Sequence, residues 1–343
     1  MKEIIVTKAE AGQRFDRYLK KYMPEAASGF LHKMLRKKNI KLNGNKAEGN
    51  EKIREGDSIQ IYFSEETLAK FTGRTGRNVS SVSKDERPVG KKKLSTGKRE
   101  ESLRQQVHLL YATEDILIFH KPAGMLTQKA RPEDDSLNDY LLDYCRKNDI
   151  IKEGTTAFRP SVANRLDRNT SGIVAAGKSL AGLQMLSGVF KDRSIHKYYQ
   201  CLVSGVIRDE KKNQVRILTE AEAKRFGGRD GDEEPKRIRT KYEPIATDGR
   251  FTLLKVTLLT GRSHQIRAHL ASLGHPIVGD SKYGGVSKVN PSGRTVKYQL
   301  LHSYRLEFPK LAEPFAYLSG KVFEAPMPGH FASVLKETGI RLP

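Results

Sequence analysis

The sequence predicts an α+β protein with a small N-terminal unit, a linker and a larger mixed domain. Two short amphipathic helices followed by alternating strands occupy residues 12–63. The stretch 66–105 has no apolar period, and short apolar strands mixed with amphipathic helices begin at His108. We therefore divide the chain into residues 1–65, 66–105 and 106–343.

The composition of the chain indicates which class of molecule it binds. The formal net charge is +22 over 343 residues. A protein this basic usually binds a polyanion, so nucleic acid is the expected partner and a solvated basic surface is the alternative. Cys145 and Cys201 lie far apart, which argues against a disulfide framework and against a metal bound by cysteines. No stretch has the apolar length of a signal peptide or a membrane span, so we expect a cytoplasmic protein without a membrane partner.

The N-terminal unit begins with two predicted helices. Apolar residues recur at helical spacing from Phe15 to Tyr22, and Pro24 would end that helix. Ser28 is a candidate cap for a second helix. That helix has an apolar face of Phe30, Leu31, Met34 and Leu35, and a basic face of Lys33, Arg36 and Lys37. A basic helix face suits a phosphate backbone, and a solvated face is the alternative.

Strands follow the helices. Ile40–Leu42 alternates and leads into Asn43–Gly44, a hairpin-turn dipeptide, and Ile59–Phe63 is a further strand. This pattern resembles the RNA-binding domain shared with small-subunit ribosomal protein four (the S-four domain), on the strength of Arg14, Asp16 and the stretch from Ser28 to Gly44. The resemblance implies RNA contacts from Arg14, Lys33, Arg36 and Lys37.

The middle stretch is predicted to be a flexible basic linker. Residues 66–105 contain many more Lys and Arg than Asp and Glu, and they lack the apolar residues that a core requires. The linker either follows RNA non-specifically or only joins the two folded parts.

From His108 onward strands and helices are mixed. Residues 207–238 are polar and predict a surface loop or hairpin. One predicted helix has Leu137, Leu141, Leu142 and Cys145 on its inner side, and a second has Leu183, Leu186 and Phe190 at helical spacing. The predicted strands are 109–111, 116–119, 173–176, 195–203, 239–245 and 251–259, and the predicted helices are 137–145 and 180–190.

One stretch contains a candidate catalytic carboxylate. Asp167 lies between Arg165 and Arg168, and a loop of small polar residues leads from it into the apolar run Ile173–Ala176. Flanking arginines favour an ionised aspartate, and an ionised aspartate beside a rigid strand can act as a nucleophile or a general base. The alternative is a turn aspartate that hydrogen-bonds its own backbone.

Two further segments carry candidate site residues. In the strand 195–203, the ring of Tyr199 can stack on a nucleobase and its hydroxyl can relay a proton, a half-buried strand tyrosine being the alternative. Gly261 can open the turn into a helix, whose N-terminus favours an anion. His264 and His269 are five residues apart, about 140° on a helix, so they do not have the i, i+4 spacing of metal ligands.

These segments together resemble a known family. Asn164-Arg-Leu-Asp-Arg-Asn-Thr-Ser-Gly172 is similar to the signature of the RluA family of pseudouridine synthases, in which many members have His where this chain has Asn164. Further likeness, in order along residues 108–332, comes from His120-Lys-Pro-Ala-Gly124, Lys197-x-Tyr199, Thr260 to His269, Gly274 to Asp280, Leu300-Leu-His302 and Phe323 to Pro328.

The resemblance implies a fold and a reaction. The fold is the pseudouridine-synthase catalytic fold, a bent, largely antiparallel mixed sheet with flanking helices. The reaction is isomerisation of uridine to pseudouridine in RNA, which requires no metal and no organic cofactor. Asp167 would attack either the ribose anomeric carbon or carbon six of uracil. Arg267 would keep Asp167 ionised and oriented, and Tyr199 would stack on the uracil and assist proton removal.

The resemblance also implies RNA contacts. Arg165 would fill the space of the extruded base, and Arg168, Lys197, Arg262 and His264 would contact RNA. The appended N-terminal domain favours large-subunit ribosomal RNA over transfer RNA, as in the RluC and RluD branches, and a monomer is expected. The alternatives are a non-catalytic RNA-binding or ribosome-associated protein and a metal-dependent nuclease, which the lack of clustered carboxylates disfavours.

Overall fold

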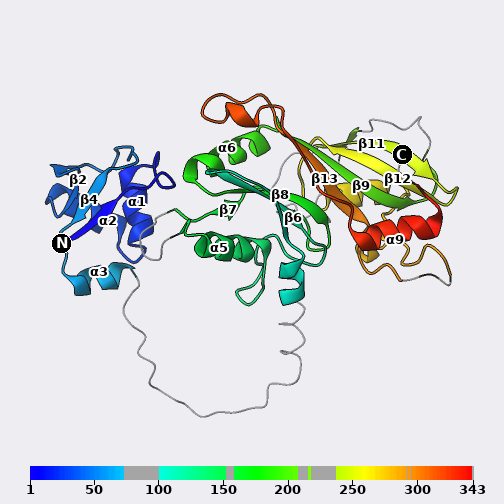
Figure 1. Ribbon diagram of the computed structural model, residues 1–343, viewed down its shortest axis with the longest axis horizontal. Helices are drawn as coiled ribbons and strands as arrows, with labels where there is room; N and C mark the ends of the chain where they lie inside the picture. The colour runs from blue at the N-terminus through cyan, green and yellow to red at the C-terminus, as the bar shows by residue number, and fades with distance from the viewer. Residues whose placement is uncertain are drawn as a thin grey trace, which may run out of the picture.

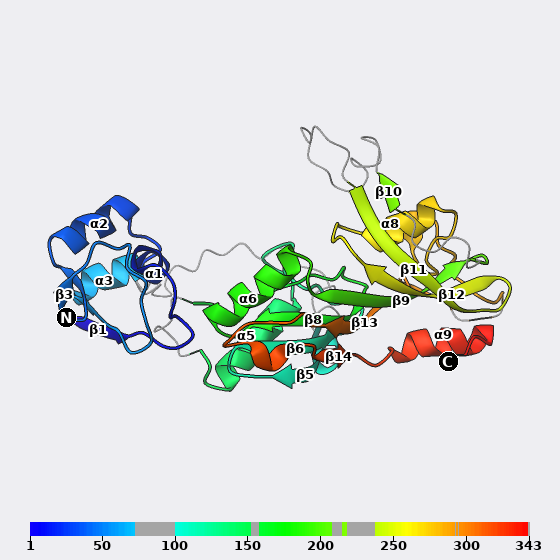
Figure 2. The same cartoon turned by 90° about the horizontal axis from the view of Figure 1, so that it is seen from above.

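The structure is a computed structural model that describes residues 1–72, 100–151, 158–207, 215–217, 237–291, 293 and 295–341. Two β-sheets organise these residues, a four-stranded sheet near the N-terminus and a ten-stranded sheet in the remainder (Figures 1 and 2). Within these ranges, no helix has the length and apolar character needed to cross a membrane.

The N-terminal sheet is antiparallel throughout. Its strands run in the order β1-β4-β2-β3. The predicted hairpin is confirmed, because Asn43 and Gly44 join β2 to β3 with φ values of 51° and 77°, the positive values that a tight hairpin turn requires. The strands are β1 (Lys2–Ile5), β2 (Ile40–Leu42), β3 (Asn45–Lys46) and β4 (Ser58–Ile61).

Two helices pack on this sheet, as predicted. In α1 (Phe15–Tyr22) and α2 (Ser28–Arg36) the apolar residues are buried in a shared core, and α2 exposes its basic face to solvent. The predicted cap is wrong by one position, because Ala27 is the N-cap of α2 and Ser28 is its first helical residue. No side chain caps this helix.

The predicted linker is wrong at both of its ends. Residues Glu65–Thr72 form α3, and its Phe71 ring lies 4.7 Å from the ring of Phe30 in α2. Residues 100–105 are also helical, and Leu103 packs against the core of the larger sheet. The few apolar residues at each end are therefore enough for docking onto a neighbouring core. The rest of the predicted linker, 73–99, lies outside the described residues.

The large sheet has the order β10-β11-β12-β9-β13-β8-β6-β5, with β14 paired to β13 and β7 to β8. All neighbours are antiparallel except β13 and β8, which are parallel. The predicted large, mainly antiparallel mixed sheet with flanking helices is confirmed. Its strands are β5 (His108–Ala112), β6 (Ile116–Lys121), β7 (Ser161–Val162), β8 (Ser171–Gly177), β9 (His196–Ser204), β10 (Val215–Ile217), β11 (Arg237–Thr247), β12 (Phe251–Leu258), β13 (Leu301–Glu307) and β14 (Val322–Glu324).

The parallel pair depends on a glycine. Ser171 and Gly172 of β8 lie opposite His302 and Ser303 of β13. Gly172 has a φ of 123°, and a Cβ atom there would lie 2.2 Å from the carbonyl oxygen of Ser303. Only glycine therefore permits this close pairing, which joins the two halves of the sheet beside the Asp167 loop.

Helices cover both faces of the large sheet. Alternate residues of β6 point to opposite cores, Leu117 and Phe119 to one and Ile116 and Ile118 to the other, so the first four residues of the strand are all apolar. Helices α5 (Leu137–Lys147) and α8 (Gln265–Ser272) contribute to the first core, α6 (Leu180–Lys191) to the second, and α9 (Gly329–Thr338) to a third cluster farther along the sheet.

The helix predicted at 180–190 is α6. Leu186 and Val189 are buried, and Leu183 and Phe190 are partly buried. Gly182 permits a close backbone contact, because a Cβ atom there would lie 2.2 Å from the carbonyl oxygen of Asp115. The start of α6 therefore packs closely against the residue that precedes β6.

The other predictions for the larger domain are confirmed, or they fall on residues that the structure does not describe. The helix predicted at 137–145 is α5, with the expected residues buried. In the predicted polar insertion, β10 pairs with β11 as a hairpin would require, and 208–214 and 218–236 lie outside the described residues. The N-terminal unit contacts the larger part where Ala9 accepts a 3.0 Å hydrogen bond from the Leu180 amide.

Candidate active site

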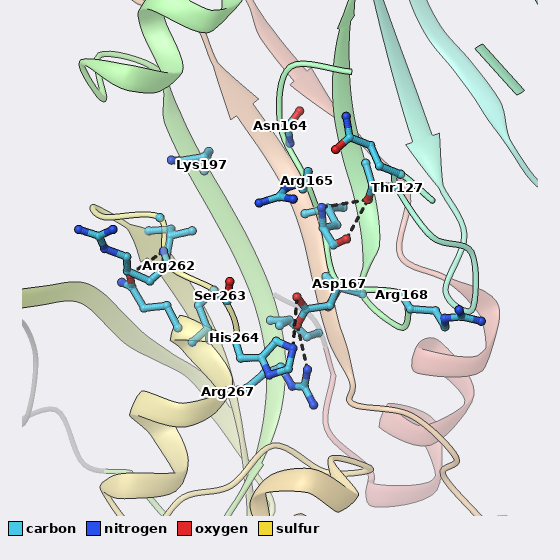
Figure 3. A pocket seen from close by; sticks show the side chains of 18 of the residues that line it. Thr127, Asn164, Arg165, Asp167, Arg168, Lys197, Arg262, Ser263, His264 and Arg267 are labelled. Carbon is cyan, nitrogen blue, oxygen red and sulfur yellow. Dashed lines mark hydrogen bonds and ion pairs between the residues drawn. The ribbon is translucent and has the colours of Figure 1, made fainter. Parts of the chain in front are cut away.

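A polar cavity of about 620 Å³ gathers the residues predicted for the catalytic domain (Figure 3). Its floor comes from β9 and β13, and its walls from the loop before β8 and the turn before α8. The predicted residues in it are Asp167, Tyr199, Arg267, Arg165, Arg168, Lys197, Arg262 and His264.

The Asp167 loop is fixed by backbone hydrogen bonds on both sides of the carboxylate. Thr127 donates its hydroxyl to the Leu166 carbonyl at 2.8 Å and accepts from the Leu166 amide at 3.1 Å. The Thr170 amide donates to the Asp167 carbonyl at 3.0 Å, which closes a tight turn. The Asp167 side chain is 27% exposed and points into the cavity. A short polar turn thus places a carboxylate at the end of a buried strand.

Lys121 supports the same loop and was not among the predicted site residues. Its side chain is fully buried, and its ammonium group donates to the carbonyls of Pro122, Met125 and Arg168 at 2.9, 2.8 and 3.1 Å. Burial lowers the pKa of Lys121 to about 7, and the nearby Asp167 carboxylate opposes that shift. The sequence placed this lysine only in a strand-ending turn, because its carbonyl partners are invisible in a sequence.

Asn164 has a structural role that the sequence left unexplained. Its side-chain carbonyl accepts from the Ala175 amide at 2.8 Å, and its NH₂ group donates to the Ile173 carbonyl at 3.3 Å. The side chain therefore pairs with the edge of β8 as a strand would. This pairing continues the β7–β8 ladder, in which Ala163 donates to Ala175 at 2.8 Å.

Arg267 lies between two carboxylates. It donates from Nη1 to Asp167 Oδ2 at 2.9 Å, so the predicted contact is present. Its Nε and Nη2 atoms bind both oxygens of Asp280 at 2.6 and 2.8 Å. Burial lowers the pKa of Arg267, but hydrogen bonds to Asp280 and Asp167 outweigh burial and raise that pKa above its ordinary value. Asp280, which the sequence placed only in a Gly-Asp segment, thus orients Arg267 toward Asp167.

His264 approaches the other oxygen of Asp167. Its Nε2 lies 3.9 Å from Asp167 Oδ1, and its Nδ1 is 3.1 Å from the Tyr283 hydroxyl. Burial lowers the pKa of His264, and the nearby Arg267 and Lys282 lower it further, against the pull of Asp167. His264 has a left-handed φ of 54° and is the N-cap residue of α8, so the turn that follows Gly261 leads into a helix that begins at Gln265.

Tyr199 and Lys197 reach the cavity from β9. Tyr199 is 6% exposed, and burial raises the pKa of its hydroxyl to about 12, so the hydroxyl is protonated at neutral pH. Tyr198 points to the opposite face, as the strand geometry predicts. Burial lowers the pKa of Lys197, whose ammonium group lies 5.9 Å from the centre of the Phe190 ring.

The other three arginines that line the cavity differ in their surroundings. Arg165 and Arg262 are exposed, and within the described part of the chain neither forms an ion pair. Arg168 points away from the cavity, and its guanidinium lies 3.7 Å from Asp134 (Figure 3). Two cations are therefore available to a phosphate backbone at the mouth of the cavity.

The four residues predicted for RNA binding in the N-terminal unit lie outside this cavity. Arg14 is exposed and pairs with Asp16 at 2.8 Å, and Lys33, Arg36 and Lys37 are exposed on α2. No group of three or more His, Cys, Asp or Glu side chains in the described part of the chain is arranged to bind a metal ion.

Comparisons with known proteins agree with this site. A model of the RNA pseudouridylate synthase family matches residues 115–272, which include Asp167, Tyr199 and Arg267. An uncharacterized RNA pseudouridine synthase of Mycoplasma pneumoniae is 29% identical over 98% of this chain and 99% of its own. Ribosomal large subunit pseudouridine synthase C of Rickettsia bellii is 29% identical over 96% of this chain and 100% of its own.

A solved structure agrees with the fold. Human RNA pseudouridylate synthase domain containing 4 matches 73% of this chain and 99% of its own with a TM-score of 0.54 at 17% identity. The family model matches residues 115–272, and relatives named as pseudouridine synthases align with nearly the whole chain at 29% identity. The chain is therefore similar to the RNA pseudouridine synthases, as its resemblance to the RluA family predicts.

Proposed function

We propose that this enzyme converts specific uridines of large-subunit ribosomal RNA to pseudouridine, with Asp167 as the nucleophile. The observation that carries the proposal is the state of the Asp167 carboxylate. Arg267 binds its Oδ2 at 2.9 Å, whereas Oδ1 faces the cavity without a hydrogen-bond partner among the described residues. One oxygen is thus oriented by a cation, and the other is free to attack.

The isomerisation needs no imported group. The bond from ribose C1′ to N1 of uracil breaks, the base turns, and a bond from C1′ to C5 forms. The proton on C5 is lost and N1 gains one, so the product has the composition of the substrate. Asp167 attacks either C1′ or C6, and both routes require the oriented carboxylate and a cavity that lets the base rotate.

The other cavity residues have roles that fit this reaction. Tyr199, protonated and buried, offers a ring face to the uracil and a hydroxyl for the proton transfer at C5. Arg165, exposed at the mouth, replaces the extruded base in the RNA stack. Arg262 and Lys197 contact the phosphates, and His264 contacts the base beside Asp167.

The choice of RNA rests on two observations. The exposed basic face of α2 and the excess of positive charge favour a structured RNA over a short one. Full-length relatives include a protein named ribosomal large subunit pseudouridine synthase C. A synthase acting on transfer RNA is the alternative.

The test compares wild type with Asp167→Asn on ribosomal RNA from cells that lack this protein, with pseudouridines mapped by chemical sequencing. New pseudouridine is expected with wild type and not with the variant. The control is Glu133→Gln, which removes an exposed carboxylate close to the cavity and should retain activity. Activity in Asp167→Asn would refute the assigned nucleophile. Modification of transfer RNA alone would move the substrate to the alternative.

A further inference from the structure

A second polar cavity of about 600 Å³ lies beside the catalytic cavity. Gln128 and Lys129 line both cavities, so the two are adjacent along this segment. The second cavity continues onto the start of α5 through Asn138 and Asp139, and onto the strand before the Asp167 loop through Arg159. A chain that enters the first cavity can therefore reach the second without leaving the surface of this segment.

Two cations line the second cavity, and one of them has no carboxylate partner among the described residues. Lys129 forms an ion pair with Asp139 at 3.2 Å, and Asp139 also accepts a 2.6 Å hydrogen bond from the Ser136 hydroxyl. Arg159 is exposed, and it forms no ion pair with any residue that the structure describes. A guanidinium without a carboxylate partner next to a catalytic cavity is suited to a phosphate.

Two side-chain amides complete the lining. Asn138 uses its carbonyl oxygen to accept from the Val162 amide at 3.1 Å, which fixes the side chain and leaves its NH₂ group to donate. Gln128 is exposed at the junction of the two cavities. Amide groups of this kind can hydrogen-bond the edge of an unstacked base.

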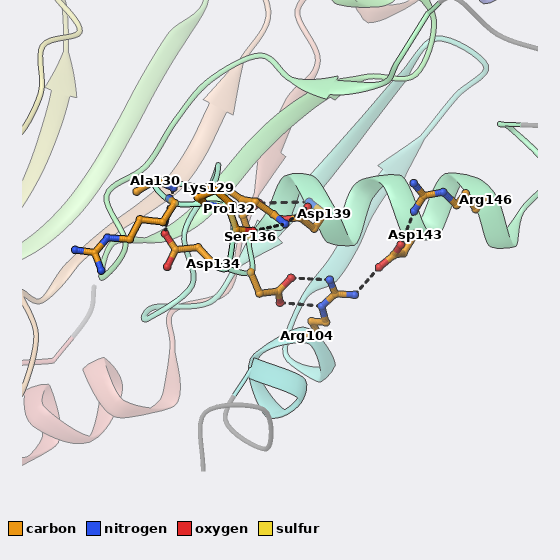
Figure 4. A network of polar contacts seen from close by, with 11 residues as sticks. Arg104, Lys129, Ala130, Pro132, Asp134, Ser136, Asp139, Asp143 and Arg146 are labelled. Atoms are coloured by element: carbon orange, nitrogen blue, oxygen red, sulfur yellow. Dashed lines mark hydrogen bonds and ion pairs between the residues drawn. The ribbon is translucent and has the colours of Figure 1, made fainter. Parts of the chain in front are cut away.

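The segment shared by the two cavities belongs to the loop 128–136, which polar contacts tie to α5 and to Arg104 (Figure 4). Arg104 binds both oxygens of Asp135 at 2.8 and 2.6 Å and also Asp143 of α5 at 2.7 Å. At the base of the loop, the Leu137 amide donates to the Leu126 carbonyl at 2.8 Å. A loop that is fixed in advance loses little conformational entropy when it binds RNA.

We propose that the second cavity binds the nucleotide next to the target uridine, with Arg159 on its phosphate and the amides of Gln128 and Asn138 on its base. The proposal rests on the proposed function. A uridine that leaves the stack to reach Asp167 pulls its neighbour past the shared segment. The neighbour then meets the one lining cation that has no carboxylate partner in the described structure.

The test uses the full-length protein and a labelled short oligoadenylate with one central uridine, titrated by fluorescence anisotropy at several salt concentrations. Arg159→Gln should weaken binding about tenfold, because a charge-assisted hydrogen bond is lost. The slope of log affinity against log salt should fall by about 0.7, the value for one phosphate contact on a single strand. The matched control is Arg146→Gln, an exposed arginine outside both cavities.

A second probe separates a phosphate contact from a general loss of charge. It is the same RNA with neutral methylphosphonates at the two linkages beside the uridine. Wild type should lose affinity for this RNA, and Arg159→Gln should lose almost none, because its contact is already gone. Equal losses in both proteins would overturn the proposal, as would an Arg159→Gln affinity equal to that of Arg146→Gln.

Two further measurements test the binding site when Arg159→Gln is unstable and distinguish its failure from a failure of the proposed function. If Arg159→Gln shows a lowered melting temperature, Gln128→Ala tests the base-reading half of the site and should weaken binding without changing the salt slope. Pseudouridine formation is followed in parallel with wild type on ribosomal RNA. If the methylphosphonate RNA shows that Arg159 contacts the phosphate but no pseudouridine forms, the proposed function is refuted and the binding site stands. If pseudouridine forms but Arg159 does not contact the phosphate, the binding site is refuted and the proposed function stands.

Discussion

At the scale of single residues, a chain of three charges runs from the buried core to the cavity. Asp280 is 1% exposed and binds Arg267 with both oxygens, and Arg267 binds Asp167 at 2.9 Å. The guanidinium cannot rotate without breaking both contacts to Asp280. The direction in which Asp167 presents its free oxygen is therefore determined in part by a residue that does not line the cavity.

Two buried histidines predict a pH dependence of stability. His120 is 8% exposed and His302 is fully buried, and their rings lie 5.6 Å apart. Burial, with nearby positive groups, lowers the pKa of each from 6.5 to about 4, although hydrogen bonds to Ala325 and Ser171 oppose the shift at His302. Both rings are therefore neutral in the folded protein at neutral pH.

The lowered pKa values of the two histidines determine the direction in which the free energy of unfolding changes with pH. The unfolded chain binds protons near pH 6.5 and the folded chain only near pH 4, so acid favours unfolding. The free energy of unfolding should fall between pH 6.5 and pH 4 by about 3 kcal/mol for each histidine. Urea unfolding at a series of pH values measures it. His120→Leu should flatten the profile, and a profile unchanged from wild type would contradict the assignment.

The residue scale also shows what a sequence can predict. The residues that face the cavity carry recognisable motifs, and they converge in the structure as expected. Lys121 and Asn164 escaped prediction, because their partners are backbone carbonyls and amides, which the residue types in a sequence do not reveal. Their role is set by tertiary geometry, which the side-chain type alone does not encode.

At the scale of elements, periodicity predicted the existence of helices better than their contacts. Helix α5 buries the residues that its period selects. In α6, the close contact of Gly182 with the Asp115 carbonyl involves no apolar side chain, so periodicity does not predict it. The helical ends of the predicted linker were missed because their order comes from docking onto neighbouring cores.

Arg104 belongs to the helical residues 100–105, and its substitution tests how this segment affects the loop between the two cavities. Arg104→Gln removes three hydrogen bonds to Asp135 and Asp143, so the loop that separates the two cavities should loosen. We expect a loss of about 2 kcal/mol in the free energy of unfolding, and a raised KM for RNA with little change in kcat. Thermal unfolding and steady-state kinetics measure both.

Arg146→Gln is the matched control, since Arg146 contacts only Asp143 among the residues that the structure describes, and is exposed. It should cost less than about 1 kcal/mol and leave KM unchanged. Equal effects of the two substitutions would show that the loop does not depend on Arg104. A fall in kcat without a rise in KM would place its effect in the chemistry instead of in RNA binding.

At the scale of the whole molecule, the N-terminal unit adds a second basic surface. We expect the triple substitution of Lys33, Arg36 and Lys37 by Gln to weaken binding to ribosomal RNA and to reduce the salt slope by up to about 2. The kcat at saturating RNA should be unchanged, because these residues lie outside the cavity. Filter binding over a range of salt concentrations and single-site kinetics measure the two quantities.

The control for this triple variant is the replacement of Lys147, Lys191 and Lys336, exposed lysines on helices of the larger part. It removes the same charge from surfaces that we do not assign to RNA. If both triple variants bind alike, the α2 face has no special role and the positive charge acts only as a diffuse field.

The order of strands in the large sheet has a consequence for the order of synthesis. β13, at 301–307, lies between β9 and β8 in the middle of the sheet, yet it is one of the last strands made. A growing chain emerges N-terminus first at about 5–20 residues per second. The Asp167 loop is therefore made many seconds before the strand that joins the two halves of the sheet beside it. We expect the catalytic cavity to be complete only after β13 has been translated, so a nascent chain that ends before β13 should lack activity.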